Sequence, residues 1–415
     1  MSTPVGAMSA RDASDDIDGR YAWRRLLVSL MLSTIGGIGL WSVVVVLPSV
    51  QAEFGVARGS ASLPYTATMM GFALGGVLMG RLADRFGIVV PIILGAIALS
   101  AGYVLAAHTT SLWQFMIVQG TMIGMLGSSA TFGPLVADVS HWFSRRRGIA
   151  VAACASGNYL AGTVWPPILQ YFVDTVGWRQ THLGIGLVCA VTMLPLALAL
   201  RRRAPIVHGT LSPAQFAAQA PVSAASPKVL QGWLVVAGLS CCIAMSMPQV
   251  HIVAYCGDLG YGAARGAEML SLMLGLGVIS RLASGWIADH IGGAYTLLLG
   301  SALQCLALLF YLPFNGLTSL YVVSALFGLS QGGIVPSYAI IVREHFAPQE
   351  AGTRIGLVLM ATVVGMAAGG WMSGAIFDLT GSYQAAFING ILWNLLNLSV
   401  AVWLLRQPRR VLATA

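Results

Sequence analysis

Twelve runs of apolar residues, each about 20 residues long, divide most of the 415-residue chain. An α-helix rises about 1.5 Å per residue, so each run is long enough to cross the roughly 30 Å hydrocarbon layer of a membrane. Only 9% of the residues are charged and 57% are hydrophobic, whereas soluble domains contain about 25% charged residues. We therefore predict an all-α membrane protein with twelve transmembrane helices. Their predicted bounds are 26–48, 62–80, 89–107, 112–137, 148–172, 182–200, 232–254, 266–288, 294–313, 319–342, 354–377 and 384–405.

The positions of the basic residues predict the orientation in the membrane. With the N-terminus in the cytoplasm, 18 of the 22 Lys and Arg residues fall in cytoplasmic segments. Arg58, Arg179 and Arg265 fall on the other side, and Arg281 lies inside a predicted helix. The positive-inside rule therefore places both termini of a multi-pass protein in the cytoplasm, and the cell membrane is the expected location. The net charge of +8 follows from the same bias, so the lipid bilayer is the expected partner and nucleic acid is not.

The longest interval between apolar runs is rich in Pro, Ala and Ser and begins with a basic cluster, which is typical of a flexible linker. It separates two sets of six predicted helices. The predicted organisation is a cytoplasmic N-terminal tail (1–25), an N-terminal six-helix bundle (26–200), a cytoplasmic linker (201–231), a C-terminal six-helix bundle (232–405) and a cytoplasmic tail (406–415).

The two sets of helices repeat one another. The sequence GRLADRFG at 80–87 matches GWIADHIG at 285–292, an offset of 205 residues. Asp174 and Asp378 lie in a second pair of similar segments, FVDTVGWRQ and IFDLTGSYQ, and are 204 residues apart. Two matches at nearly one offset indicate a duplication. Parallel repeats of six helices place a substrate site between the bundles near the middle of the membrane, with access alternating between its two sides.

The loop after the second predicted helix resembles the hallmark of the major facilitator superfamily, and this resemblance covers nearly the whole chain. It implies the major facilitator fold and a loop that helps to hold the cytoplasmic gate. The basic pair that usually follows the motif is missing, because residues 88–90 are Ile-Val-Val. The second copy keeps the aspartate. The residues that match the gate motif are Gly80, Asp84, Arg85, Gly87 and, in the second copy, Asp289.

Residues 141–162 and 247–292 resemble the monocarboxylate porter and oxalate/formate antiporter-like branch of that superfamily. Its members bind the substrate carboxylate with an arginine of the eighth helix, four residues before a glycine. Arg281 and Gly285 match this pattern. The resemblance therefore implies that Arg281 binds the carboxylate of a small organic anion.

The alternative for Arg281 is that its long side chain snorkels towards the membrane surface near Asp289, about 12 Å away along the helix. Three points favour the binding role. The repeat offset pairs position 281 with Gly76, so the charge is specific to the second half. No acidic residue lies inside another predicted helix to neutralise it, and a planar guanidinium matches a carboxylate well.

The predicted helix 11 has no lysine after Arg354, whereas related dicarboxylate antiporters carry one there. A single deep cation favours a monocarboxylate over a dicarboxylate. Relatives in animals add a lysine in helix 1 and an aspartate four residues before the helix 8 arginine. This chain has neither, since position 277 is glycine, so their scheme of proton coupling cannot simply be transferred.

His251 is a candidate for proton coupling, because histidine changes charge near neutral pH. The alternative is a neutral, hydrogen-bonded packing residue. Asp258 follows at the predicted helix end as a structural or gating residue that pairs with His251 or with Arg265. Further candidates for substrate contact are uncharged, and each can instead serve as a hydrogen-bonding link between helices. They are Gln119, Asn158, Gln331 and Tyr338.

The predicted function is secondary active transport of a small organic anion by alternating access, with proton symport or anion exchange. The alternatives are a drug or metabolite exporter of the same superfamily and a membrane receptor or sensor with vestigial transport. No nucleophile motif, phosphate-binding loop or metal-ligand spacing is present, so neither an enzyme, a cofactor nor a metal site is expected. The six cysteines have no characteristic spacing and are expected to pack within helices. The working unit is expected to be a monomer.

Overall fold

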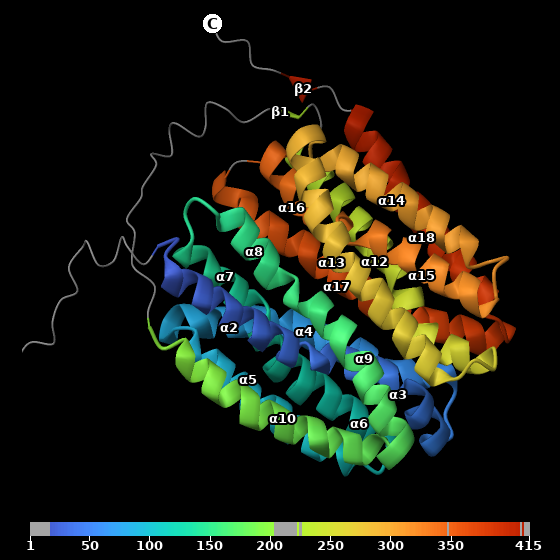
Figure 1. Ribbon diagram of the computed structural model, residues 1–415. Coiled ribbons are helices and arrows are strands. Elements are labelled where there is room, and N and C mark those ends of the chain that lie inside the picture. Colours follow the sequence, from blue (N-terminus) through green and yellow to red (C-terminus); the bar gives the residue numbers. More distant parts are fainter. Residues whose placement is uncertain (1–16, 203–221, 224–225, 347, 407–408, 411–415) are drawn as a thin grey trace, which may run out of the picture.

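The computed structural model describes residues 17–202, 222–223, 226–346, 348–406 and 409–410, and these form a bundle of long helices (Figure 1). We call residues 20–199 the N half and residues 227–406 the C half. Most of each predicted tail and most of the predicted linker lie outside the described residues. The helices of the N half are α2 (Arg20–Gly36), α3 (Ile38–Phe54), α4 (Arg58–Phe86), α5 (Val89–Ala107), α6 (Leu112–Val118), η1 (Gln119–Gly127), η2 (Ser128–Thr131), α7 (Gly133–Trp142), α8 (Arg147–Ala155), α9 (Gly157–Val176) and α10 (Trp178–Ala199).

The C half is built in the same manner and lies beside the N half in Figure 1, coloured from yellow to red. Short strands β1 (Val222–Ser223) and β2 (Arg409–Arg410) pair antiparallel within the predicted linker and tail. The C-half helices are α12 (Pro227–Asp258), α13 (Ala263–Ile291), α14 (Gly293–Phe310), α15 (Leu317–Gln331), α16 (Ile334–His345), α17 (Pro348–Thr380) and α18 (Tyr383–Arg406).

Eleven of the described segments are long and apolar enough to span a membrane. The expected fifth span, 148–172, is helical but is divided into α8 and α9 at Ser156. Two prolines, Pro166 and Pro167, and the polar Asn158 and Gln170 lie within α9, which makes it less apolar than the others. The fold therefore has the expected twelve helical segments, of which the fifth is the least apolar.

Several helices extend beyond the apolar runs that predicted them, because polar residues continue a helix past the hydrocarbon layer. Helix α12 begins at Pro227 rather than at residue 232. The hydroxyl of Ser226 caps this helix by accepting a hydrogen bond from the Val229 backbone N–H, and proline is well suited to the first helical position. Helix α2 likewise begins at Arg20, six residues before the predicted bound.

We call the end of the bundle where α2 begins and α18 ends the termini side, and the opposite end the distal side. Two seams join the halves: helix α4 packs along α17, and α9 packs along α13. The contacts of both seams lie towards the distal side. A Cβ atom at Gly374 would lie 2.9 Å from the Arg58 carbonyl oxygen, and one at Gly162 would lie 2.2 Å from Leu274. Small residues thus let the helices of the two halves approach closely.

Candidate functional site

Arg281 lies in α13 where the α9–α13 seam ends towards the termini side. It is 18 residues from the first residue of the helix, Ala263, and ten from the last, Ile291, or about 27 Å and 15 Å along the axis. The side chain is half-buried. It is therefore well inside the spanning segment and at the boundary between the halves.

The guanidinium of Arg281 is held at one nitrogen and on one face. Its Nη1 donates a hydrogen bond to the Ala155 carbonyl oxygen at 3.1 Å, and its Cζ lies 4.2 Å from the centre of the Tyr159 ring. Both contacts come from the N half. The Nε atom is buried and has no hydrogen-bond partner among the described residues. Arg281 also belongs to no ion pair in this part of the chain.

Tyr159 and Gln331 lie one helical turn from Arg281 towards the distal side. A Cβ atom at Gly277, four residues before Arg281, would lie 2.6 Å from the Tyr159 ring and 3.4 Å from Gln331 Nε2. Gln331 is fully buried and its Nε2 donates to the Met273 carbonyl oxygen at 3.3 Å. Its Oε1 accepts a hydrogen bond from Gln249. The absence of a side chain at Gly277 thus leaves room for Tyr159 and Gln331 on the distal side of Arg281.

Asn158 precedes Tyr159 in α9 and contacts the first spanning segment. The indole N–H of Trp41 lies 3.0 Å from the Asn158 carbonyl oxygen and 3.3 Å from its Oδ1. The structure thus links Arg281 to Gln331 through Tyr159 and Gly277, whereas Asn158 follows next to Tyr159 in the chain and contacts Trp41.

Gln119 and Tyr338 are not brought to Arg281 by any described contact. Gln119 begins the π-helical segment η1, is fully buried, and leaves both polar side-chain atoms without a partner among the described residues. The Tyr338 hydroxyl donates to Asn397 Oδ1 at 2.8 Å, and Asn397 donates to Ser301. This chain of bonds joins α16, α18 and α14 inside the C half.

The gate-motif residues lie at the termini side, and no hydrogen bond or ion pair among the described residues joins them to the other half. Asp84, Arg85 and Asp289 are exposed, and among the described residues Asp84 and Asp289 have no hydrogen bond or ion pair. Gly87 ends α4 with φ +85°, a conformation that favours glycine, and a Cβ at Gly80 would meet open space.

A cavity of about 420 Å³ lies beside this motif and is lined by charged side chains from several N-half helices. The buried Arg25 spans it with two hydrogen bonds to Asp138, at 2.7 and 2.8 Å. This ion pair ties α2 to α7 within the N half.

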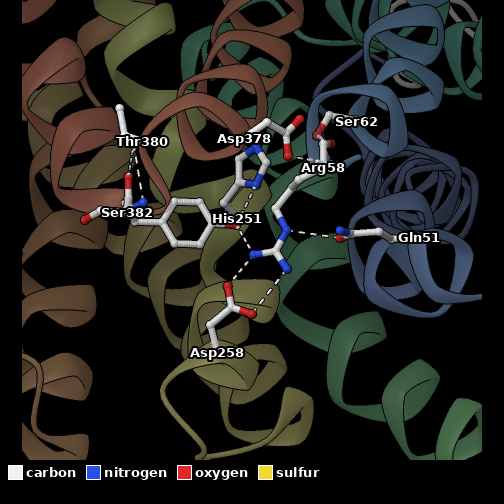
Figure 2. A network of polar contacts seen from close by, with 9 residues as sticks. Gln51, Arg58, Ser62, His251, Asp258, Asp378, Thr380 and Ser382 are labelled. Atoms are coloured by element: carbon white, nitrogen blue, oxygen red, sulfur yellow. Dashed lines mark hydrogen bonds and ion pairs between the residues drawn. The ribbon is translucent and has the colours of Figure 1, made fainter. Parts of the chain in front are cut away.

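Charged residues at the distal side join the two halves directly (Figure 2). Arg58, the first residue of α4, forms a two-pronged ion pair with Asp258 at the end of α12. Asp378 of α17 accepts hydrogen bonds from the backbone N–H groups of Arg58 and Gly59, at 2.8 and 2.7 Å. It thereby caps the N-terminus of α4 from the other half, where a negative charge is stabilised.

Tyr383 and His251 extend this cluster into the C half. Arg58 Nη1 donates to the Tyr383 hydroxyl at 2.9 Å, and that hydroxyl lies 3.2 Å from His251 Nδ1. His251 Nε2 lies 2.8 Å from the Gly370 carbonyl oxygen. We call Arg58, Asp258, Asp378, Tyr383 and His251 the distal latch.

The expected partners of Asp258 were wrong. It pairs with Arg58 rather than with His251 or Arg265, and Arg265 instead pairs with Glu268 at 2.9 Å. Arg58, Asp378 and Tyr383 were not predicted as site residues. The similarity of the segments around Asp174 and Asp378 was visible in the sequence, but nothing there indicated that Asp378 meets Arg58, 320 residues away.

Comparison with known proteins supports a single family. The family model described as Major Facilitator Superfamily matches residues 29–320 and 285–414. Monocarboxylate transporter 13 of Rattus norvegicus is 27% identical over 393 residues, which cover 89% of this chain and 86% of that protein. Monocarboxylate transporter 4 of Gallus gallus is 25% identical, with 92% and 83% covered. The fold resembles that of a peptide transporter bound to alafosfalin, with TM-score 0.74, 13% identity and coverage of 96% and 99%.

Proposed function

Because the chain belongs to the Major Facilitator Superfamily and is related to monocarboxylate transporters, we propose that it carries a small organic monocarboxylate across the cell membrane by alternating access. Arg281 binds the carboxylate, and transport is coupled to protons or to exchange of a second anion. Both termini lie in the cytoplasm, and one chain is the working unit.

The observation that carries this proposal is the unused edge of the Arg281 guanidinium. Nη1 is bonded to Ala155 and one face is covered by Tyr159. Nε has no partner, and the structure gives Nη2 no hydrogen bond among the described residues. These two N–H groups point the same way in a guanidinium and form the fork that donates to both oxygens of a carboxylate. The missing acceptor is therefore supplied by the cargo.

The surroundings of Arg281 favour one negative charge and a small body. No second cation among the described residues contacts Tyr159, Gln331 or Asn158. Tyr159 and Trp41 offer apolar surface, and Gln331 and Asn158 offer neutral hydrogen-bonding groups for the rest of an organic acid.

The seams indicate which side of the site is closed. The described contacts between the halves extend from the distal latch to Arg281, whereas Asp84 and Asp289 at the termini side are exposed and unbonded. This arrangement corresponds to a site that opens to the cytoplasm, and release of the distal latch would expose it to the other side.

The test is uptake of radiolabelled short-chain, keto, hydroxy and dicarboxylic acids into proteoliposomes. Arg281→Ala is expected to abolish uptake of the preferred acid. Arg281→Lys keeps the charge but loses the fork, and is expected to lower uptake at least about tenfold. Arg265→Ala is the matched control because Arg265 lies exposed on the same helix, and it should transport normally. Normal uptake by Arg281→Ala in correctly inserted protein would reject the site.

A further inference from the structure

Binding of the carboxylate by Arg281 does not involve the residues of the distal latch, so their role in transport has still to be explained. His251 is the innermost member of the latch and has no exposed surface. It lies on α12 between the Gly370 carbonyl oxygen of α17 and the Tyr383 hydroxyl of α18, and Figure 2 shows it beside Arg58 and Asp378. Both ring nitrogens of His251 have hydrogen-bond partners, and the Tyr383 hydroxyl connects the imidazole to Arg58 of the ion pair between the halves. The proton affinity of the imidazole can therefore depend on whether that ion pair is formed.

The hydrogen bonds determine which ring nitrogen carries the proton. A carbonyl oxygen can only accept, so His251 Nε2 donates to Gly370. In the neutral ring Nδ1 must then accept, and the Tyr383 hydroxyl donates to it while accepting from Arg58. A second proton on Nδ1 would turn this nitrogen into a donor. The Tyr383 hydroxyl would then have to accept from both His251 and Arg58 and direct its own hydrogen elsewhere.

The charges of the latch make such a proton favourable only when the halves separate. With neutral His251, the closed latch holds one positive charge, on Arg58, and two negative charges, on Asp258 and Asp378. Opening the distal side removes Arg58 with the N half and leaves both carboxylates on the C half. A proton on His251, also in the C half, is opposed by Arg58 when the latch is closed and is attracted by two unpaired carboxylates when it is open.

We propose that His251 is the binding site of a co-transported proton, and that this proton releases the distal latch. The proposal rests on the proposed function because it identifies the ion that accompanies the organic anion. By linkage, a proton that binds the open arrangement more tightly shifts the halves towards that arrangement. The proton itself stays bound to nitrogen, and no covalent bond of the substrate is broken.

A route for the proton lies along the latch. The Asp258 side chain is 37% exposed at the distal side, so it meets water there. The Tyr383 hydroxyl bonds both Arg58 and His251 Nδ1; once Arg58 has left with the N half, this hydroxyl can pass its proton to Nδ1 and take a replacement from the water that reaches Asp258. Among the described residues, the charged and titratable groups that face the imidazole are Arg58 of α4, Asp378 of α17, Tyr383 of α18 and, on its own helix, Asp258. Tyr255, also on α12, packs against the ring of Tyr383.

The experiment measures the separation of the halves directly. Spin or fluorescent labels are attached at Thr110 and Thr318, which are exposed at the distal side of the N half and the C half. The six native cysteines are buried. Distances are recorded in lipid nanodiscs from about pH 8 to about pH 5, a range in which histidine titrates, without any organic anion. The wild-type ratio of open to closed molecules is expected to rise as pH falls, by at most about tenfold per pH unit for one proton.

Three variants decide the assignment. His251→Gln should make the ratio independent of pH, whereas His108→Gln, at an exposed distal histidine outside the latch, should respond like the wild type. Asp258→Asn keeps the imidazole but breaks the ion pair, so it should be more open at neutral pH and respond less. A flat wild-type response, a normal response in His251→Gln, or a closed and normally responding Asp258→Asn would each overturn the proposal.

The experiments distinguish a failure of the proton-site proposal from a failure of the proposed carboxylate transport. Arg281→Ala should lose carboxylate uptake yet keep the pH-dependent opening, because Arg281 has no contact with the latch among the described residues. Opening that follows pH in a protein that carries no carboxylate would reject the proposed cargo and retain the latch. Carboxylate uptake together with pH-independent opening would reject the proton site at His251 and retain the proposed cargo.

Discussion

The two seams between the halves are built from equivalent helices but carry different chemistry. The repeat offset of 205 residues places α4 on α13 and α9 on α17, so the α4–α17 and α9–α13 seams occupy corresponding positions. The first seam ends at the distal side in the charged latch. The second is joined by small residues and by a hydrogen bond from Ser271 to the Thr163 carbonyl oxygen, and at its inner end it carries the unpaired Arg281.

The paired aspartates show how the seams diverged. Asp378 caps the N-terminus of α4 across the seam. Asp174, its counterpart, is exposed and accepts a hydrogen bond from Gln170 of its own helix, and the N-terminus of α13 has no side-chain cap. The two seams thus share one helix arrangement, but Asp378 bonds across the first seam, whereas Asp174 bonds only within its own helix among the described residues.

The largest stability difference is expected between the two aspartates. Asp378→Ala removes both backbone hydrogen bonds to α4 and one charge of the latch, and should lower the free energy of unfolding by about 2 kcal/mol. Asp174→Ala, the matched variant of the other seam, should change it by less than about 0.5 kcal/mol. Thermal unfolding of the two variants in the same detergent measures this difference. Equal losses of stability would mean that the two aspartates contribute alike to their seams.

A larger side chain at Gly277, in the α9–α13 seam, should displace Arg281. A Cβ atom at Gly277 would lie 2.6 Å from the Tyr159 ring, so Gly277→Ala must displace the ring on which Arg281 stacks. We expect the affinity for the transported acid to fall about tenfold, or roughly 1.4 kcal/mol. Gly184→Ala, where an added Cβ meets open space on α10, should leave it unchanged. Unaltered affinity in Gly277→Ala would mean that Tyr159 does not position Arg281.

The stacking itself is expected to contribute less. Tyr159→Ala removes the ring beneath the guanidinium, and should weaken carboxylate binding about fivefold, since an arginine over an aromatic ring is worth about 1 kcal/mol. Tyr159→Phe keeps the ring and should bind nearly normally. Titration of both variants with the acid tests this, and a phenylalanine variant as weak as the alanine variant would transfer the role from the ring to the hydroxyl.

The smallest effects are expected where the seams are alike. Thr66 donates to the Ala367 carbonyl oxygen in one seam, and Ser271 to the Thr163 carbonyl oxygen in the other. Thr66→Val and Ser271→Ala should each cost about 0.6 kcal/mol, as is usual for hydrogen bonds between membrane helices. Unfolding in detergent measures the stability of both variants. A much larger loss of stability in one of them would mean that the seams also differ in their uncharged hydrogen bonds.

The sequence predicted the helices well because their lengths follow from the thickness of the bilayer. The offset between the repeats also anticipated two similar halves, and the lone charge of Arg281 stood out within an apolar run. The distal latch could not be predicted in this way. Arg58 was predicted to lie between two helices on the non-cytoplasmic side, and its partners Asp258 and Asp378 come from helices that meet α4 only in the folded protein. Burial of Tyr338 among the C-half helices likewise depends on packing that a single sequence does not reveal.

The most direct test of the account is calorimetric binding of short-chain monocarboxylates to the purified protein and to its Arg281→Lys and Arg265→Lys variants. If Arg281 holds the carboxylate, we expect one binding site per chain, with affinity reduced at least about thirtyfold by Arg281→Lys and unchanged by Arg265→Lys. Monocarboxylate binding that is equally strong in the Arg281→Lys protein would contradict it, because the free fork of the guanidinium would then not hold the cargo.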